Sequence, residues 1–178
     1  MPPANPDQPT TSLADAKAQF INLWGASGSN WGVSKTLAQT HALLLVSPQA
    51  LSTEEIMEQL SISRGNASQT VRELIDWGLV SKELRPGERR EYFVAEKDML
   101  RVTQCIIAAR KRRELDQMKR TLDQLAQLPG NAQDPEYRAF HTALTDIQQL
   151  ADTSDKLLTR LMQAERNWLL NKFLKLFL

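Results

Sequence analysis

Residues 61–96 constrain this chain more than any other stretch, because several local signals follow one another there in a fixed order. Ser63 is suited to cap a helix over Arg64–Trp77, and Gly78 is suited to the left-handed conformation that ends a helix. Two short alternating segments, Leu79–Leu84 and Glu91–Ala95, are typical of strands. The residues between them contain Pro86-Gly87 and are charged, which predicts a tight turn. The segment therefore predicts a helix followed by a β-hairpin.

The residues just before this stretch predict a further helix. Ser52-Thr53-Glu54-Glu55 has the spacing of a capping box, in which the serine hydroxyl and the second glutamate each satisfy a free backbone amide. Ser61-Ile62-Ser63 leaves room only for a short turn between the two helices. The whole order is that of a winged helix-turn-helix, in which the second helix enters a DNA groove beside a hairpin.

Helices are expected on both sides of this module. Leu13–Ser27 carries an apolar stripe of Leu13, Ala16, Phe20, Leu23 and Trp24, and Gly25, Gly28 and Ser29 are expected to end that helix. A second helix is expected from about Asn30 to Val46. Beyond Lys97-Asp98 the pattern is helical to the end, with one helix over Met99–Leu128, a break at Pro129-Gly130-Asn131, and a weak break at Asp152–Asp155.

These patterns predict a mainly α fold with a small β-hairpin wing. The expected parts are a disordered arm at 1–12, N-terminal helices at 13–47 that serve the dimer or scaffold, the winged helix-turn-helix at 48–98, and a long helical dimerisation region at 99–178. The 42% hydrophobic content is typical of a globular chain. No apolar run approaches the roughly 20 residues that cross a bilayer.

Composition also bounds the function. The start has no signal-peptide pattern, and the single cysteine, Cys105, cannot form an internal disulfide, so we expect a cytoplasmic protein. The two histidines, His41 and His141, lie a hundred residues apart, and no metal-ligand spacing occurs. Neither a nucleophile with its base nor a phosphate loop can be assembled. We therefore expect neither an enzyme nor a metal or cofactor.

In a helix-turn-helix, side chains at the start of the later helix, here the one expected over Arg64–Trp77, meet the edges of DNA bases. Arginine can bind guanine through two hydrogen bonds, asparagine and glutamine can do the same with adenine, and serine adapts to either. Arginines of the hairpin can bind phosphates or enter a minor groove. The predicted DNA-binding residues are Arg64, Asn66, Ser68, Gln69 and Arg72 on the helix, and Arg85, Arg89 and Arg90 in the wing.

The charge of the module keeps two alternatives open. Net charge over the chain is +1, and residues 51–98 carry seven basic and ten acidic side chains, which gives −3. The polar side of the helix over Arg64–Trp77 could simply be solvated. Alternatively, the module could bind another protein without binding DNA. The basic residues of the module nevertheless gather on the helix over Arg64–Trp77 and on the hairpin.

On these residues the sequence resembles the GbsR/MarR group of winged-helix transcriptional regulators. The resemblance is carried by Phe20-Ile-Asn-Leu-Trp24-Gly25, Leu51–Ile56, Ser63–Ser68, Leu74–Val80 and Arg85–Phe93. It implies a homodimeric regulator, often a repressor, on double-stranded DNA with a two-fold operator. Some members of the group sense choline-like osmolytes through aromatic side chains, so Phe20, Trp24 and Trp31 are effector candidates, although packing in the core is the more ordinary role for Phe20 and Trp24.

A dimer needs an interface, and the long C-terminal helices offer one. Leu115, Met118, Leu122 and Leu125 alternate spacings of three and four, as in a coiled-coil seam. They could equally pack on the last helix of their own chain. Trp168 and the apolar end Trp168–Leu178 are expected to be buried in the dimer, with packing over the N-terminal helix and binding to a membrane surface as the alternatives.

Overall fold

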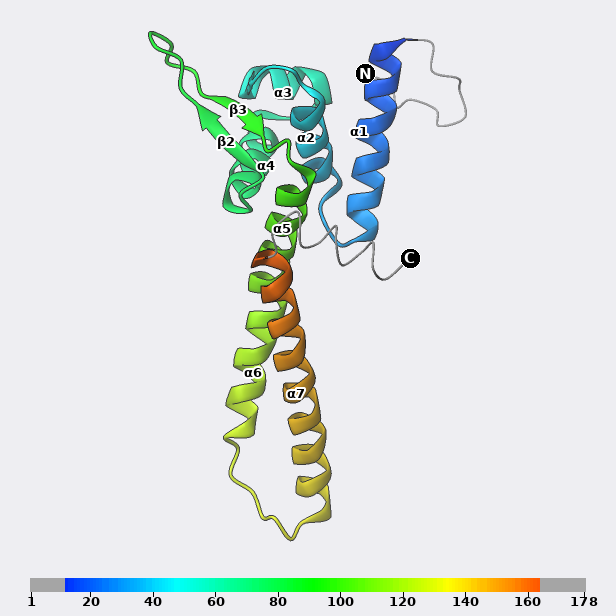
Figure 1. Ribbon diagram of the computed structural model, residues 1–178, viewed down its shortest axis with the longest axis vertical. Helices are drawn as coiled ribbons and strands as arrows, with labels where there is room; N and C mark the ends of the chain where they lie inside the picture. The colour runs from blue at the N-terminus through cyan, green and yellow to red at the C-terminus, as the bar shows by residue number, and fades with distance from the viewer. Residues whose placement is uncertain (1–11, 164–178) are drawn as a thin grey trace. The chain divides into compact units, whose positions relative to one another are not determined.

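The computed structural model in Figure 1 describes residues 12–163. The chain divides into two compact units, one ending at Val102 and the other beginning at Thr103. The fold is mainly helical with one small antiparallel sheet, as the sequence predicts. The predicted arm, apart from Ser12, and the apolar C-terminus with Trp168 lie outside the described residues.

The first unit has the element order of a winged helix. A tight turn joins α3 (Thr53–Leu60) to α4 (Arg64–Asp76), and Ser61 takes a left-handed φ of 54° there. The strands β2 (Val80–Glu83) and β3 (Tyr92–Ala95) form the wing. The remaining elements of this unit are α1 (Leu13–Asn30), α2 (Lys35–Val46), β1 (Leu51–Ser52) and the start of α5 (Met99–Arg110).

The predicted helix signals of this module are confirmed. Ser52 Oγ accepts a hydrogen bond from the amide of Glu55 at 3.3 Å, and Glu55 Oε2 accepts one from the amide of Ser52 at 2.7 Å. Ser63 Oγ accepts from the amide of Asn66 at 3.3 Å and so begins α4. Gly78 has a φ of 76°, the conformation expected after the end of that helix.

The sheet contains one strand, β1, that the sequence pattern does not predict. Its order is β1-β3-β2, with both pairs antiparallel. β1 has two residues, which are too few for an alternating pattern to be recognised. Leu51 lies opposite Phe93 and Val80 lies opposite Ala95, and all four are buried. The hairpin is thereby fixed to the segment that begins α3.

The expected end of the first helix is wrong. α1 continues through Gly25 and Gly28 to Asn30, and α2 accordingly begins at Lys35, after Ser34, rather than at Asn30. A methyl group added at Gly28 would lie 2.5 Å from Cβ of Ala38, so this glycine lets α2 approach closely. The predicted stripe of α1 is also partly wrong, since Leu13 and Leu23 are 73% and 64% exposed. The face toward α2 includes the buried Gly25 instead.

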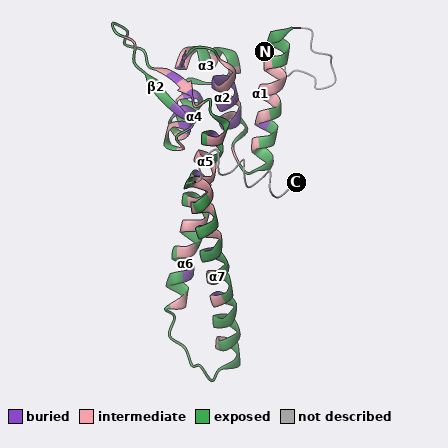
Figure 2. Ribbon diagram, viewed as in Figure 1, coloured by how far each residue is buried: buried purple, intermediate pink, exposed green. Residues whose placement is uncertain are grey.

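The core of the first unit surrounds α2. Leu44 and Ala42 of this helix are fully buried, together with Ile56 of α3 and Leu74 of α4. The buried Thr40 hydroxyl donates to the carbonyl of Thr36 at 2.8 Å. Figure 2 shows buried residues gathered on α2 and on neighbouring parts of α4 and the sheet. The opposite face of α4 is exposed.

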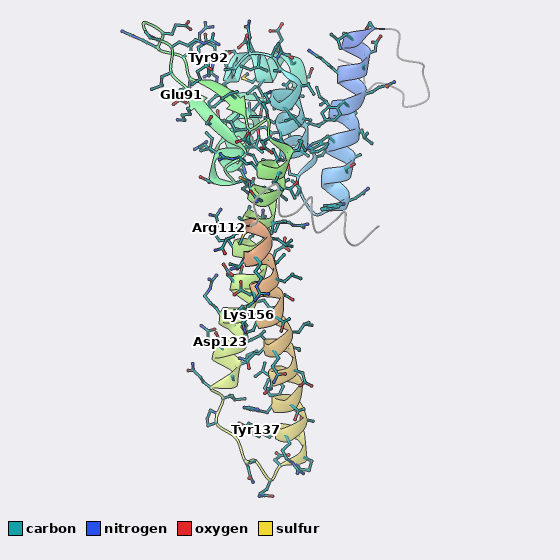
Figure 3. All side chains as sticks on the ribbon, in the orientation of Figure 1. Glu91, Tyr92, Arg112, Asp123, Tyr137 and Lys156 are labelled. Carbon is teal, nitrogen blue, oxygen red and sulfur yellow. The ribbon has the colours of Figure 1, made fainter. Side chains whose placement is uncertain are left out.

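The second unit is a helical hairpin. The expected helix over Met99–Leu128 is continuous but not uniform: α5 passes through a π-helical stretch, η1 (Lys111–Leu115), into α6 (Asp116–Ala126). α7 (Pro135–Gln163) follows the expected break, and its Tyr137 hydroxyl donates to the carbonyl of Leu128 at 3.1 Å. Figure 3 shows Tyr137 at this end of the hairpin.

The weak break expected at Asp152–Asp155 does not occur, because the carboxylates there have cationic partners on the facing helical segment. Lys119 Nζ lies 2.7 Å from Asp152 Oδ1 and 3.0 Å from Asp155 Oδ2. Lys111 Nζ lies 2.8 Å from Asp155 Oδ1. These hydrogen bonds hold the pKa of Asp155 below its ordinary value.

The apolar contacts between α6 and α7 are few. Leu122, Leu144 and Ala151 are buried together, with Leu115 and Ala126 packed beside them. No helix within residues 12–163 is both long and apolar enough to cross a membrane.

Candidate nucleic-acid interface

The two faces of α4 differ sharply. Ala67, Thr70, Val71 and Leu74 are buried on one face, and Ile75 beside them is half-buried. The opposite face carries the predicted helix residues. Arg64, Asn66, Gln69 and Arg72 are exposed and Ser68 is half-buried. Because Arg64, Ser68 and Arg72 follow one another at spacings of four, they lie along one side of the helix.

The first arginine of this face is held by a neighbouring acid. Arg64 Nη2 lies 2.5 Å from Oε1 of Glu54 on α3, and the two side chains are 68% and 44% exposed. A backbone hydrogen bond is the main cause of the lowered pKa of Glu54, and Arg64 lowers it further. Exposed ion pairs of this kind are weak and screened by salt, so a phosphate can replace the carboxylate.

Arg72 is oriented by its own helix. Its Nε donates to the carbonyl of Ser68 at 3.1 Å, and the side chain otherwise faces solvent. No ion pair is recorded for Arg72 within residues 12–163, which distinguishes it from Arg64. The guanidinium can therefore meet a base edge or phosphate without first leaving a carboxylate.

Gly65 has no role that the fold explains. A methyl group added there would have no atom within 4 Å apart from its own helix and chain neighbours, and the residue lies within helical backbone. Glycine weakens a helix by about 0.5–1 kcal/mol relative to alanine. A close approach by another molecule is a physical reason for a glycine at this exposed site.

The wing is shaped by contacts among its own charged and aromatic residues. The Arg85 guanidinium lies 3.8 Å from the centre of the Tyr92 ring, and its Nε lies 3.1 Å from Glu83 Oε1. The Tyr92 hydroxyl donates to Glu88. Lys82 Nζ lies 2.6 Å from Glu91 Oε1 across the two strands. Figure 3 shows Glu91 and Tyr92 on this hairpin.

The other two wing arginines lie in the turn. Arg89 and Arg90 are exposed, and the turn is built around Gly87 with a φ of 83°. Hydrogen bonds from Ser52 are the main cause of the lowered pKa of Glu55, and the charges of Arg85 and Arg90 lower it further. The wing cations therefore act on the start of α3, where Glu54 and Glu55 lie.

One structural residue at this site has no sequence signal. Lys97 Nζ donates to the carbonyls of Leu44 and Leu45 at 2.7 Å and of Ser47 at 3.0 Å. These are carbonyls at the end of α2, which lack partners within the helix. Lys97 thereby fixes the end of the wing to the end of α2. The two segments are about fifty residues apart in the sequence, so no local sequence pattern predicts this contact.

The predicted effector and dimer residues occupy mixed environments. Phe20 and Trp24 are half-buried with ring centres 5.5 Å apart, and Trp31 is 67% exposed. A groove of about 410 Å³ between α1, α2 and the end of α3 is lined by other residues.

The predicted dimer residues divide into two pairs. Leu115 and Leu122 pack toward α7 of the same chain, whereas Met118 and Leu125 are 43% and 42% exposed. Their roles in binding an effector or a partner remain predictions.

Three comparisons with known proteins bear on this arrangement. Residues 32–91 match the model of the MarR family. The "Putative HTH-type transcriptional regulator YvaV" of Bacillus subtilis (strain 168) is 23% identical over 90 residues, which cover 51% of each protein. The chain thus spans about half the length of the curated relative it matches. A solved structure described as "Crystal Structure of a transcriptional regulator" superimposes with a TM-score of 0.65 at 21% identity, covering 83% of this chain and 96% of the other.

These matches confirm the winged-helix fold. The family match covers α2, β1, α3, α4, β2 and the turn of the wing, which are the elements that build the face described above. The structural likeness extends over most of the chain and so includes helices outside the winged helix.

Proposed function

We propose that this chain, whose residues 32–91 match the model of the MarR family, is a sequence-specific DNA-binding transcriptional regulator that acts as a homodimer on a two-fold operator in the cytoplasm. The observation that carries the proposal is the two-sided α4, which buries Ala67, Val71 and Leu74 and leaves Arg64, Asn66, Gln69 and Arg72 outside. In a helix-turn-helix, residues at the start of the second helix meet base edges in the major groove.

A repressor is the form of regulator that we propose, because a bound dimer can cover the site where transcription begins. The resemblance to GbsR-type members and the aromatic pair of Phe20 and Trp24 support control by an effector, with a quaternary ammonium as the chemical class to try first. No catalytic step is part of this proposal.

Arg72 gives the most direct test of DNA reading. Arg72→Ala should weaken binding to the operator about 5- to 150-fold, since a base contact of this kind contributes roughly 1–3 kcal/mol. The fold should survive because the side chain is exposed. The measurement is a titration against operator DNA, identified by mapping bound sites across the genome, together with circular dichroism.

Arg138→Ala is the matched control, because it removes an exposed arginine from α7. The control should bind like the unaltered protein. Equal operator affinity of all three proteins would remove α4 as the reading helix.

A second candidate function is a winged helix that binds another protein without DNA. The acids beside the wing and α4 favour it, since Arg64, Lys82 and Arg85 each have a carboxylate partner. Salt dependence separates the two functions. Binding of DNA releases counterions, so the slope of log K against log salt should flatten by up to about 0.9 for each phosphate contact that is lost.

Arg89→Ala with Arg90→Ala should therefore flatten that slope and weaken binding to all DNA sequences alike. The measurement is a binding isotherm at several salt concentrations, for operator and for unrelated DNA of equal length. A slope that does not change would exclude the wing turn from phosphate contact. No DNA binding by the unaltered protein at low salt would favour the protein-binding module.

A further inference from the structure

α7 carries a second apolar stripe that its own hairpin does not cover. The side of α7 that faces α6 contains Leu144 and Ala151, which are buried. Outside that side, Ile147 is 45%, Leu150 is 68% and Leu157 is 59% exposed. Figure 2 shows long exposed stretches along this helix. The second stripe, hereafter the outer stripe, consists of six apolar residues and one serine, of which Ser154 and Leu161 are half-buried and the rest exposed: Phe140, Ala143, Ile147, Leu150, Ser154, Leu157 and Leu161.

The spacing of the outer stripe is that of a coiled-coil seam. Its members alternate steps of three and four residues from Phe140 to Leu161 without interruption. A helix of 29 residues extends about 43 Å, which is long enough to pair along its length with another helix. A row of exposed large apolar side chains of this kind usually marks an interaction site.

We propose that the outer stripe is the seam by which two copies of this chain pair α7 against α7 in antiparallel orientation about a two-fold axis near Asp152. This inference deepens the homodimer of the proposed function and rests on that part of it. It assigns a different surface from the one that Leu115, Met118, Leu122 and Leu125 would provide.

The sizes of the side chains along the seam support this register. Antiparallel pairing about that axis places Ile147 opposite Leu157 of the partner subunit. It places Leu150 opposite Ser154 of the partner subunit, and Ala143 opposite Leu161 of the partner subunit. Every one of these layers therefore contains a large apolar side chain, and each small residue faces a large one, which is how packed cores avoid gaps.

The charges beside the seam support the same register. Asp146 and Arg160 both lie one position before a stripe residue, so they flank the seam on the same side. Both are exposed, and no ion pair is recorded for either within residues 12–163. Antiparallel pairing places Asp146 beside Arg160 of the partner subunit, and the two-fold axis repeats this pair.

A parallel pairing has neither advantage. It would place Ala143 beside Ala143 of the partner subunit and Ser154 beside Ser154 of the partner subunit, which leaves two layers without a large side chain. It would also place Asp146 next to Ala151 of the partner subunit, with no cation opposite. The pattern of sizes and charges therefore distinguishes the antiparallel seam from the parallel one.

Charge reversal tests the seam. Asp146→Arg or Arg160→Asp alone should weaken the dimer about tenfold, because each change creates two like-charge contacts by symmetry. The double variant D146R/R160D exchanges the partners and should bring the dimerisation constant back to within about threefold of the unaltered protein. Sedimentation equilibrium of the full-length chain measures these constants, and Arg138→Asp is the matched control on another side of α7.

Distances between spin labels test the orientation. On a Cys105→Ser background, labels at Thr142 should be roughly 30 Å apart along the helix axis in the antiparallel dimer, and labels at Gln149 about 9 Å apart along it, at 1.5 Å per residue. Equal distances at the two positions would indicate a parallel pairing and overturn the proposal.

The possible failures are separable. A dimer whose constant is unchanged by D146R and by R160D overturns the seam while leaving DNA recognition by α4 intact. A chain that is monomeric at all concentrations overturns both the seam and the homodimer, whatever its operator affinity. Loss of operator affinity in Arg72→Ala with an unaltered dimer leaves the seam supported.

Discussion

At the scale of single residues, His41 is a buried polar side chain whose effect on stability depends on pH. Its side chain is only 3% exposed on α2, and its Nε2 atom has no hydrogen-bond partner within residues 12–163. Burial, aided by the nearby charge of Lys97, lowers the pKa of His41 from 6.5 to about 4. The folded protein therefore holds this imidazole neutral at pH values where an unfolded chain would protonate it.

The direction in which stability changes with pH follows from the difference between the pKa of His41 in the folded and unfolded chain. Well above pH 6.5 the histidine is neutral in both states, so stability does not depend on pH through this group. As the pH falls from 6.5 toward 4, protonation favours the unfolded chain, so stability should fall by about 2 kcal/mol at pH 5. Urea unfolding at pH 7 and pH 5 measures this loss.

A change at each of the chain's two histidines makes the test specific. His41→Leu should reduce the loss of stability between pH 7 and pH 5 by about 2 kcal/mol. His141→Gln, at the exposed histidine, is the matched control and should keep the loss of the unaltered protein. If His41→Leu and the unaltered chain lose the same stability over this range, another group governs the acid sensitivity.

At the scale of elements, two glycines inside helices have opposite reasons to be there. Gly28 of α1 lies against Ala38 of α2, where an added methyl group would be 2.5 Å from a Cβ atom that cannot rotate away. Gly65 of α4 has open space around it. The first glycine therefore serves helix packing, and the second serves no contact within the described fold.

Alanine at each position should reveal this difference. Gly28→Ala should lower the free energy of unfolding by about 1–3 kcal/mol through overpacking, despite the better helix propensity of alanine. Gly65→Ala should leave stability unchanged or raise it by up to about 1 kcal/mol, while weakening operator binding. Urea midpoints and operator titrations measure the two effects, and equal stability changes at both positions would contradict this assignment.

At the scale of the whole molecule, stability and assembly should be linked. The described contacts between α6 and α7 bury few large side chains, while several remain exposed on α7. A second copy that covers this surface would stabilise the fold by mass action. The outer stripe thus offers a reason for a small apolar core in the second unit.

This linkage should be visible in thermal unfolding. If the folded chain is a dimer, a tenfold dilution should lower its unfolding midpoint by about 2 °C, because the transition then depends on concentration. Calorimetry over a hundredfold range of concentration measures this, and the single variant Asp146→Arg should reduce the dependence. A midpoint that does not move with concentration would indicate unfolding without dissociation.

Short-range signals determined much of this protein. Ser52 with Glu55, Ser63 and Gly78 fix the bounds of α3 and α4 through hydrogen bonds and backbone conformations that involve only neighbours in the sequence. For this reason the winged helix, and the set of polar residues at the start of α4, could be predicted from the sequence. Their exposure follows because Ala67, Val71 and Leu74 lie on the other side of the same helix.

Tertiary structure decided what depends on distant neighbours. Gly28 lies inside α1 and does not end it. A glycine is found there because Ala38 of α2 occupies the space that a side chain would need. β1 exists because Phe93 and Tyr92 pair with it, and α7 continues through Asp152 and Asp155 because Lys111 and Lys119 neutralise them. The sequence by itself predicted which face of α4 carries the polar side chains, whereas only the folded chain decided which acids pair with that face and which apolar residues of α7 stay exposed.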